Sequence, residues 1–293
     1  MYARRATRIW LLMLLLGWTS GMSSAMAQTA AEVFPAVVYL QGHSAKRVTI
    51  GQREGDLWVR YDGESTPQPV MSRASGSGFI VLADETLYLV TAEHVARGVL
   101  LDTEVILRGP DDTPLMYRLS DLARFTPPKW VYHSEADVAV AALAPPHEFR
   151  AAIKAVSIDE IADSLAAPDI ELYLTTIGFP LSLGLAGKFS PIANTSHSAS
   201  GIFRYRRFDN NKETDFYILE DPSVSGFSGA LVAKLPSVCV GVMRSGQGAF
   251  QCVGLVHGTF NDPTGGKFAA IVPGSRVKET VLLAAQELEA AGH

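Results

Sequence analysis

The feature that most constrains this chain is a long series of short apolar runs separated by Gly, Pro, Asp and Asn. Runs of this length between turn-forming residues are typical of β-strands, and helical spacing of apolar residues is rare before the end of the chain. With 47% hydrophobic residues the chain is apolar enough to fold around a core. The runs are residues 36–40, 57–61, 78–82, 86–90, 104–107, 116–119 and 138–143 in the first half, and 170–177, 201–206, 216–219, 230–233, 238–243, 252–256 and 268–272 in the second.

Two halves of similar kind follow from this pattern. Pro145-Pro146, followed by helical spacing at residues 158–165, marks a seam in a chain whose length commonly divides into two cores. No long helices alternate with the strands, which excludes a doubly wound parallel sheet. We therefore predict an all-β protein of two antiparallel six-stranded β-barrels, residues 28–150 and 151–293, with a helix at the C-terminus. Ser275 is placed to cap this helix, and its apolar face holds Val277, Val281, Leu282, Ala285 and Leu288.

The first 27 residues resemble an export signal. Arg4, Arg5 and Arg8 precede an apolar stretch at residues 9–18, and Ala25-Met26-Ala27 has the small-x-small pattern of a cleavage site. A retained membrane anchor is the alternative, but a spanning helix needs about 20 apolar residues. We therefore predict a signal peptide at residues 1–27, a periplasmic or secreted protein, and no stable membrane insertion after its removal.

Export makes the two cysteines informative. Cys239 and Cys252 lie on apolar runs on either side of the turn-forming residues 245–248, which predicts a hairpin with a disulfide across it. Two buried free thiols are the alternative. A metal site is disfavoured because no second Cys or His pair stands at ligand spacing.

Charge and glycine spacing argue against several partners. The net charge is −5, and no run of Lys and Arg is long enough to follow a phosphate backbone, so nucleic-acid binding is not expected. Gly187-Lys188 and Gly266-Lys267 both lack the first glycine of a phosphate-binding loop. We therefore expect chemistry without a cofactor or metal.

Two residues stand where an acid–base pair would be held. His94 follows the apolar run at 86–90 and enters a tight turn, a place where an imidazole can be held rigidly as a general base. Asp137 opens the run at 138–143, and a buried carboxylate beside an imidazole fixes its tautomer and stabilises its cation. Taken alone, each is more often structural, as a hydrogen-bonded histidine or a strand-edge carboxylate.

Ser228 stands in the motif Gly226-Phe227-Ser228-Gly229. Glycines on both sides allow a turn that exposes Oγ while the backbone N–H groups of Gly226 and Ser228 converge on one point. Such a point is an oxyanion hole. A flexible Ser/Gly turn is the alternative, and the order His94, Asp137, Ser228, each beside a predicted strand, is what favours catalysis.

In these motifs the chain resembles the trypsin-like serine proteases of chymotrypsin fold, and within them the bacterial Do-like, high-temperature-requirement branch without a PDZ domain. The likeness is carried by residues 33–38, 76–80, 91–95, 137–140, 226–229, 253–255 and 268–273. It implies a serine endopeptidase acting on polypeptides, in which Ser228 attacks the peptide carbonyl, His94 moves its proton and Asp137 orients His94. It also implies that residues 255–258, including His257 and Gly258, pair with the substrate backbone; a packed, hydrogen-bonded His257 is the alternative.

The chain departs from this family in several places. Phe227 replaces the usual Asp or Asn before the nucleophile, and Ala230 replaces a glycine. Phe227 argues against zymogen activation by a new N-terminus and suggests a latent resting state. Pro222 stands at the expected base of the specificity pocket, which favours a small or apolar residue before the cut bond. The insert at residues 42–73 is long enough for a lid or a partner-binding loop, and the oligomeric state is left unassigned.

Two other functions compete with the protease. A catalytically silent scaffold of the same fold, acting as a binding module, would keep the barrels without the chemistry. An α/β-hydrolase would use the order serine, acid, histidine, for which Asp262 and His293 follow Ser228. Ala230 stands where its motif needs glycine, and the strand–helix alternation is missing, so this second alternative is disfavoured.

Overall fold

The computed structural model describes residues 30–41, 48–53, 56–61, 68–69, 75–98, 103–146, 150, 153–185, 187–240, 243–246 and 248–291. The predicted signal peptide, residues 1–27, lies outside this part of the chain. Among the described residues, no helix is both long enough and apolar enough to cross a bilayer.

The first sheet has eight strands. Seven of them pair in the order β8-β7-β1-β5-β6-β10-β9, and β11 pairs with β5 in parallel while every other pair is antiparallel. Their bounds are β1 Val37–Gln41, β5 Ser75–Ala83, β6 Thr86–Thr91, β7 Glu104–Arg108, β8 Pro114–Arg118, β9 Trp130–Tyr132, β10 Ala139–Leu143 and β11 Val156–Ser157.

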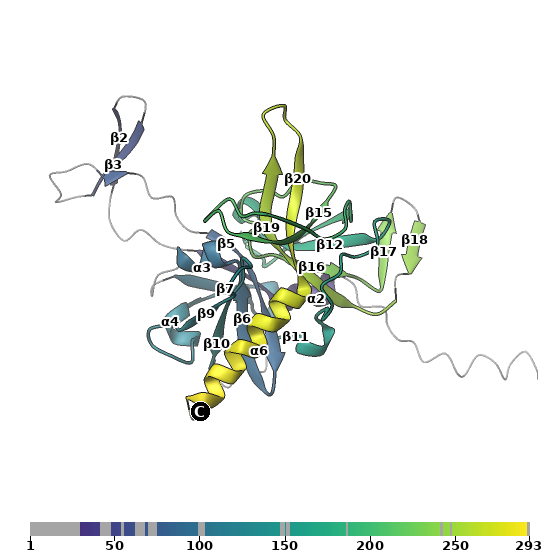
Figure 1. The fold of residues 1–293 in the computed structure, drawn as a ribbon. Coiled ribbons are helices and arrows are strands. Elements are labelled where there is room, and N and C mark those ends of the chain that lie inside the picture. The colour runs from purple at the N-terminus through teal and green to yellow at the C-terminus, as the bar shows by residue number, and fades with distance from the viewer. Residues whose placement is uncertain are drawn as a thin grey trace, which may run out of the picture.

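The second sheet is antiparallel and has seven strands in the order β13-β12-β16-β19-β20-β15-β14. Its strands β19 and β20 form a long hairpin that projects from the body (Figure 1). The bounds are β12 Tyr173–Gly178, β13 Ile192–His197, β14 Phe203–Arg206, β15 Glu213–Leu219, β16 Leu231–Lys234, β19 Gln251–Asn261 and β20 Lys267–Pro273.

Smaller elements join or extend these sheets. The predicted insert contains a sheet of its own, β2-β3-β4, and a two-stranded hairpin, β17-β18, stands before β19. The bounds of these strands are β2 Val48–Arg53, β3 Asp56–Tyr61, β4 Gln68–Pro69, β17 Ser237–Val240 and β18 Met243–Gly246. The helices are α2 Ala30–Val33, α3 Glu93–Arg97, α4 Leu119–Leu122 and α6 Gly274–Ala290, with 3₁₀ turns η1 Phe34–Ala36, η2 Pro110–Asp112, η3 Ile158–Glu160 and η4 Pro180–Ser182.

The predicted architecture is confirmed: the protein is mostly β, with one sheet in each half and a helix near the C-terminus. The strand counts are eight and seven rather than six and six, and among the described residues no pairing joins the outer strands of either sheet. β11 belongs to the first sheet although it follows residue 150, and the division of the chain at that residue stays a prediction.

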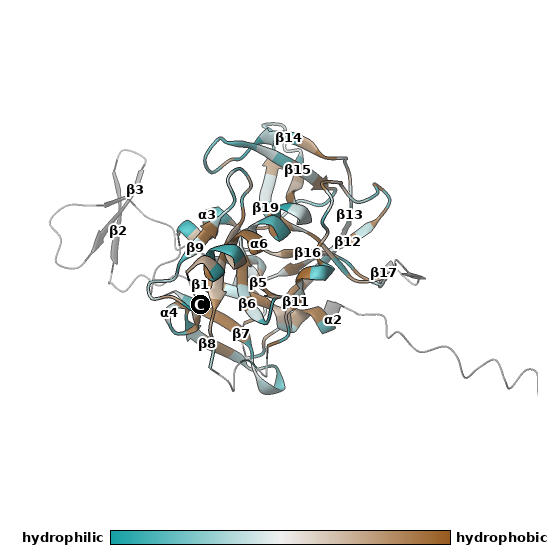
Figure 2. Ribbon diagram, turned by 60° about the horizontal axis from the view of Figure 1, so that its bottom comes forward, coloured by the Kyte–Doolittle hydropathy of each residue, from teal (hydrophilic) through white to brown (hydrophobic). Residues whose placement is uncertain are grey.

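Each half buries the faces of its strands, because the short apolar runs place alternate or successive side chains in the interior. One large cluster of buried apolar residues draws on both sheets, from Val37 in β1 to Val272 in β20. Figure 2 shows this distribution, with hydrophobic strands inside and hydrophilic segments toward the edges. No strand was predicted at β13, because most of its side chains are at least partly exposed and it lacks an apolar run.

Two helix predictions need correction. The helical spacing at residues 158–165 produces only the single turn η3, closed by a capping box between Ser157 and Glu160, after which Ile161 bridges to Cys252. The terminal helix α6 is N-capped at Pro273, so Ser275 lies inside it and caps nothing.

The terminal helix packs on both sheets. It contacts β10 and β9 of the first sheet and β19 and β20 of the second, and Figure 1 shows it lying across the body. Val277, Val281 and Leu288 are buried as expected. Leu282 is 42% exposed, however, and Ala284 is buried in its place, so the buried face is rotated from the one that the sequence indicated.

The cysteines do not face each other across one hairpin. In the backbone pairing Cys239 lies opposite Arg244, whereas Cys252 lies opposite Ala233. Cys252 is buried and has no disulfide partner in the described part of the chain, and burial raises the pKa of its thiol to about 12. The side chain of Cys239 lies outside the described part of the chain, so the disulfide stays a prediction.

The state of Cys252 gives the first testable prediction. At pH 8 a buried thiol of such high pKa is almost entirely protonated, and the thiolate is the reacting form. We expect iodoacetamide to modify Cys252 at least about 100-fold more slowly in the folded protein than in urea, as measured by peptide mass spectrometry. Equal rates in the two states would contradict the burial. If unreduced protein in urea leaves Cys252 unmodified until a reductant is added, Cys252 is in a disulfide.

Candidate active site

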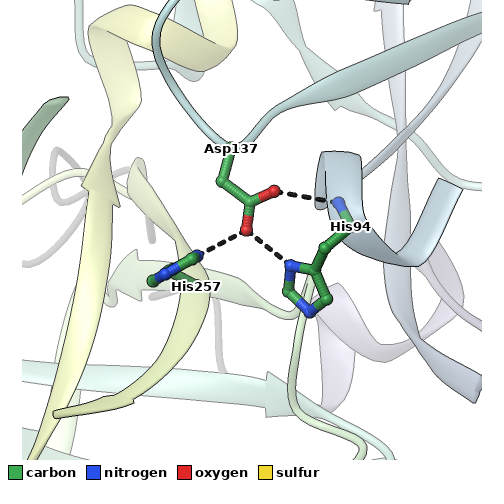
Figure 3. A group of neighbouring side chains, drawn as sticks. All are labelled: His94, Asp137 and His257. Carbon is green, nitrogen blue, oxygen red and sulfur yellow. Dashed lines mark hydrogen bonds and ion pairs between the residues drawn. The ribbon is translucent and has the colours of Figure 1, made fainter. Parts of the chain in front are cut away.

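His94 and Asp137 are brought together by the pairing of β6 with β10. Thr91, the last residue of β6, lies opposite Ala139, the first residue of β10, so the end of one strand is beside the start of the other. His94 follows in α3, and Asp137 precedes β10. The His94 Nδ1 lies 2.7 Å from Asp137 Oδ2, and the backbone N–H of His94 donates to Asp137 Oδ1 at 3.0 Å (Figure 3). These two contacts fix both the ring and its peptide.

A second histidine binds the same carboxylate. His257 Nδ1 lies 2.5 Å from Asp137 Oδ2, the oxygen that His94 also contacts (Figure 3). His257 stands at a bulge in β19, between Val256 and Gly258, and a bulge re-aims the side chain that it carries. Its ring is fully buried, and its Nε2 has no hydrogen-bond partner in the described part of the chain. Of the two sequence alternatives for this side chain, the structure shows the packed, hydrogen-bonded one.

The fourth member of the cluster is Arg207, which the sequence analysis missed. Arg207 follows β14 and is fully buried. Its Nη2 donates to Asp137 Oδ1 at 2.9 Å, and its Nη1 donates to Glu93 Oε2 at 2.7 Å. Its Nε and Nη2 also bind Asp209, at 2.9 and 2.6 Å. Three arginines occur within residues 204–207, and no local pattern distinguishes the one that turns inward.

Asp137 is held in its ionised form. Burial alone would raise its pKa, but hydrogen bonds from His257 and His94 outweigh burial and hold the pKa well below the usual range. A permanently charged carboxylate that accepts from His94 Nδ1 leaves the other ring nitrogen, Nε2, as the basic one.

His94, Asp137 and His257 each offer one atom that could bind a metal, and these atoms lie within 4.8 Å of one another. The same atoms already hydrogen-bond to each other. The guanidinium of Arg207 also occupies the remaining carboxylate oxygen, so a divalent cation here would meet a fixed positive charge. The arrangement suits proton transfer better than metal binding.

Ser228 stands beside this cluster in a turn that docks on both sheets. Its carbonyl accepts from Ser77 N of β5 at 2.8 Å, and its Oγ donates to the His257 carbonyl at 3.3 Å. Gly229 packs closely against the end of β6, where a Cβ on Gly229 would lie 3.0 Å from Ala92 N. Among the contacts of the described residues, none joins Ser228 Oγ to His94. The turn is therefore adjacent to the histidine pair, with the hydroxyl directed to a backbone carbonyl.

The backbone of the same turn leaves two donors open. Gly226 has a φ of +95°, a conformation that glycine adopts readily. The carbonyl of Ser225 accepts from Leu181 N, and the carbonyl of Gly226 accepts from Ser77 Oγ, both at 2.7 Å. The N–H groups of Gly226 and Ser228 have no acceptor in the described part of the chain. These are the two donors that the sequence assigned to an oxyanion hole.

The cavity next to the turn is small. Pro222, Phe227 and Val256 are among the residues that line it, and its volume is about 10 Å³, roughly the space of one water molecule. Phe227, the departure from the family pattern, is 4% exposed and packs in the apolar cluster beneath. Gly258 is covered by the ring of Phe208, because a Cβ there would lie 2.6 Å from that ring.

Similarity to known proteins is found among solved structures and not among family models or curated sequences. Neither a protein-family model nor a curated protein sequence matches the chain. Among solved structures, an inactive form of Rv3671c from M. tuberculosis H37Rv is 14% identical with a TM-score of 0.48, over 87% of this chain and 89% of that one.

Two further structures are similar at the same level. The HtrA-type protease AlgW with a decapeptide is 17% identical with a TM-score of 0.47, and human heparin binding protein is 10% identical with a TM-score of 0.46. These matches cover 88% and 85% of this chain; they cover 66% of AlgW and 90% of heparin binding protein. All of these matches lie below 20% identity and below a TM-score of 0.5, and the fold described here rests on this chain's own two sheets and terminal helix.

The tight docking of the Ser228 turn predicts unequal effects at two glycines. Gly229 and Gly187 have similar φ values, +83° and +79°. A Cβ at Gly229 would lie 2.1 Å from the Ser77 carbonyl oxygen, whereas a Cβ at Gly187 would meet no described atom within 4 Å. We expect Gly187→Ala to lower the free energy of unfolding by about 1 kcal/mol from backbone strain. Gly229→Ala should cost about 1–3 kcal/mol more from overpacking. Urea unfolding measures both, and equal costs would contradict the close approach.

Proposed function

We propose that this protein is an exported serine endopeptidase that hydrolyses peptide bonds through a Ser-His-Asp triad and a covalent acyl-enzyme. The observation that carries the proposal is the ionised, buried Asp137 bound to Nδ1 of His94, with the Ser228 turn docked beside it. Asp137 orients the ring and stabilises the imidazolium. We propose a periplasmic or secreted location from the N-terminal sequence, and a division into two lobes near residue 150.

In this mechanism Ser228 Oγ attacks the substrate carbonyl while His94 Nε2 takes its proton. His94 then returns the proton to the leaving amine. A water molecule, deprotonated by His94 in the same way, attacks the acyl-enzyme and releases the acyl group. For the attack, the Ser228 side chain must rotate from the His257 carbonyl toward His94. The negative oxygen that forms has two open donors available, the N–H groups of Gly226 and Ser228. Losing one such donor typically costs about 2.7–4 kcal/mol of transition-state stabilisation.

The substrate class that fits is a polypeptide with a small residue before the cut bond. The cavity lined by Pro222 and Phe227 admits little more than a methyl-sized group, which is too small for a lysine or arginine side chain to reach Asp221, a carboxylate that also lines it. The Phe227 ring takes up this space, which supports a preference for residues such as alanine or serine.

A silent binding module of the same fold is the second candidate. The observation that favours it is the hydrogen bond from Ser228 Oγ to the His257 carbonyl, which holds the hydroxyl away from its base. The same observation is expected of a latent enzyme whose serine turns toward His94 when substrate binds. The two candidates differ in the reactivity of Ser228.

Labelling of Ser228 separates the enzyme from the silent module. We expect a fluorophosphonate probe to add to the mature chain at Ser228, as located by mass spectrometry, and to add to no site in Ser228→Ala. We also expect peptide hydrolysis to fall by roughly 10⁶-fold in Ser228→Ala and in His94→Ala, because triad members act as a unit. Asp262→Asn is the control and should be labelled at the normal rate. If the folded protein is not labelled at Ser228, with or without added peptide, the protease is rejected and the binding module is the remaining candidate.

Cleavage of a peptide library tests the size of the cavity. The wild-type protein should prefer alanine or serine over leucine or phenylalanine before the cut bond. Phe227→Leu should move this preference toward larger residues, because it removes ring atoms from the cavity lining. Phe250→Leu shortens a buried phenylalanine that lines a different cavity, near Glu32 and Lys154, and should leave the preference unchanged. An unchanged profile in Phe227→Leu would show that this cavity does not select substrate.

A further inference from the structure

Arg207 is a buried arginine that joins the two halves of the protein at Asp137. It comes from the second half, at the end of β14, and is 0% exposed. All three of its side-chain nitrogens donate. Nε binds Asp209, Nη1 binds Glu93 and the Glu135 carbonyl, and Nη2 binds Asp137 and Asp209. A buried charge so fully paired cannot turn away from its partners without leaving several of them unsatisfied.

The contact from Arg207 completes the coordination of the Asp137 carboxylate. An ionised carboxylate has about four acceptor positions. At Asp137 Oδ1 they are used by the backbone N–H of His94 and by Arg207 Nη2, and at Oδ2 by Nδ1 of His94 and of His257. Without Arg207, Oδ1 would lose its only charged donor and keep only the backbone N–H of His94.

We propose that Arg207 is a positioning residue that orients Asp137 toward His94 and offsets part of the negative charge that His94 experiences. The inference rests on the proposed protease function, because it concerns the same triad. Arg207 contacts neither His94 nor Ser228 in the described structure, so it acts only through Asp137.

The sign of the effect follows from the charges around His94. Asp137 favours the imidazolium form of His94, and a guanidinium 2.9 Å from the same carboxylate opposes that effect. The other groups facing this cluster are Glu93 and Arg97 of α3, His257 of β19 and Asp209 after β14, with the edge of Phe208 against the His94 ring. Asp209 binds the guanidinium directly and weakens its charge. Arg207 therefore offsets part of the negative potential that Asp137 exerts on the His94 ring.

Two variants should move the titration of His94 in opposite directions. Asp209→Asn frees the charge of Arg207, so the His94 ring should be half protonated at a lower pH than in the wild-type protein. The double variant Arg207→Met, Asp209→Asn removes one charge of each sign from the cluster, which limits the cost to folding. It leaves Asp137 uncompensated, so the midpoint should rise relative to the wild-type protein.

Nuclear magnetic resonance of the imidazole signals in the mature chain measures these midpoints, with His94→Gln used to assign the His94 signal. Arg276→Met is the matched control. Arg276, in the terminal helix, is also a largely buried arginine, and its Nη2 donates to Asp215 of β15 at 2.6 Å. Its loss should lower stability without moving the His94 midpoint. Asp209→Asn alone keeps the test decisive if the double variant fails to fold. Shifts of the same sign in both variants, or no shift in Asp209→Asn, would overturn the proposal.

The same samples separate this proposal from the proposed function. The rate of fluorophosphonate labelling at Ser228, followed against pH, should show an acidic limb that moves with the NMR midpoint in each variant. Opposite NMR shifts in a chain that is never labelled would support the role of Arg207 at Asp137 and reject the protease. If the wild-type protein is labelled and the acidic limb of its labelling rate lies at the same pH in both variants, the protease is supported and the role of Arg207 is rejected.

Discussion

The buried carboxylate of Asp137 is the interaction on which the rest of the site depends. It precedes β10 of the first sheet, yet it accepts from His94 of the same half and from His257 and Arg207 of the other half. An uncompensated carboxylate in this interior would cost several kcal/mol, so its donors must stay in place for the protein to remain folded. The hydrogen bonds that hold Asp137 ionised therefore also hold the two halves in register.

The Ser228 turn depends on the same junction. Its carbonyl is held by β5 of the first sheet, and its hydroxyl is held by the His257 backbone in β19. Close backbone contacts at Gly229 and the positive φ at Gly226 leave little room for other residues. A turn fixed at both sides keeps the open N–H groups of Gly226 and Ser228 in a set arrangement, as the proposed oxyanion site requires. The Ser228 hydroxyl is directed to the His257 carbonyl, so the proposed activity requires this side chain to rotate.

The fold was largely readable because strand signals are local. Apolar runs such as the one at 86–90 became strands close to their predicted bounds, and the terminal helix followed from its periodicity. The errors arose where tertiary contacts decided the outcome. The helical spacing at 158–165 gave only one turn, because Ile161 instead pairs with Cys252. The cysteines, predicted on one hairpin, stand opposite Arg244 and Ala233, because β17 turns back through β18 before β19 begins.

The sequence by itself determined a β-rich chain of two halves and the three motifs of His94, Asp137 and Ser228, because each motif is a short pattern beside a strand. Only the tertiary structure decided that His257 and Arg207 share Asp137 with His94. These residues are separated from Asp137 by 120 and 70 positions, and a buried ion pair between such distant residues leaves no periodic or local pattern in the chain. Their role follows from burial and hydrogen-bond geometry, which exist only once the two halves have packed together.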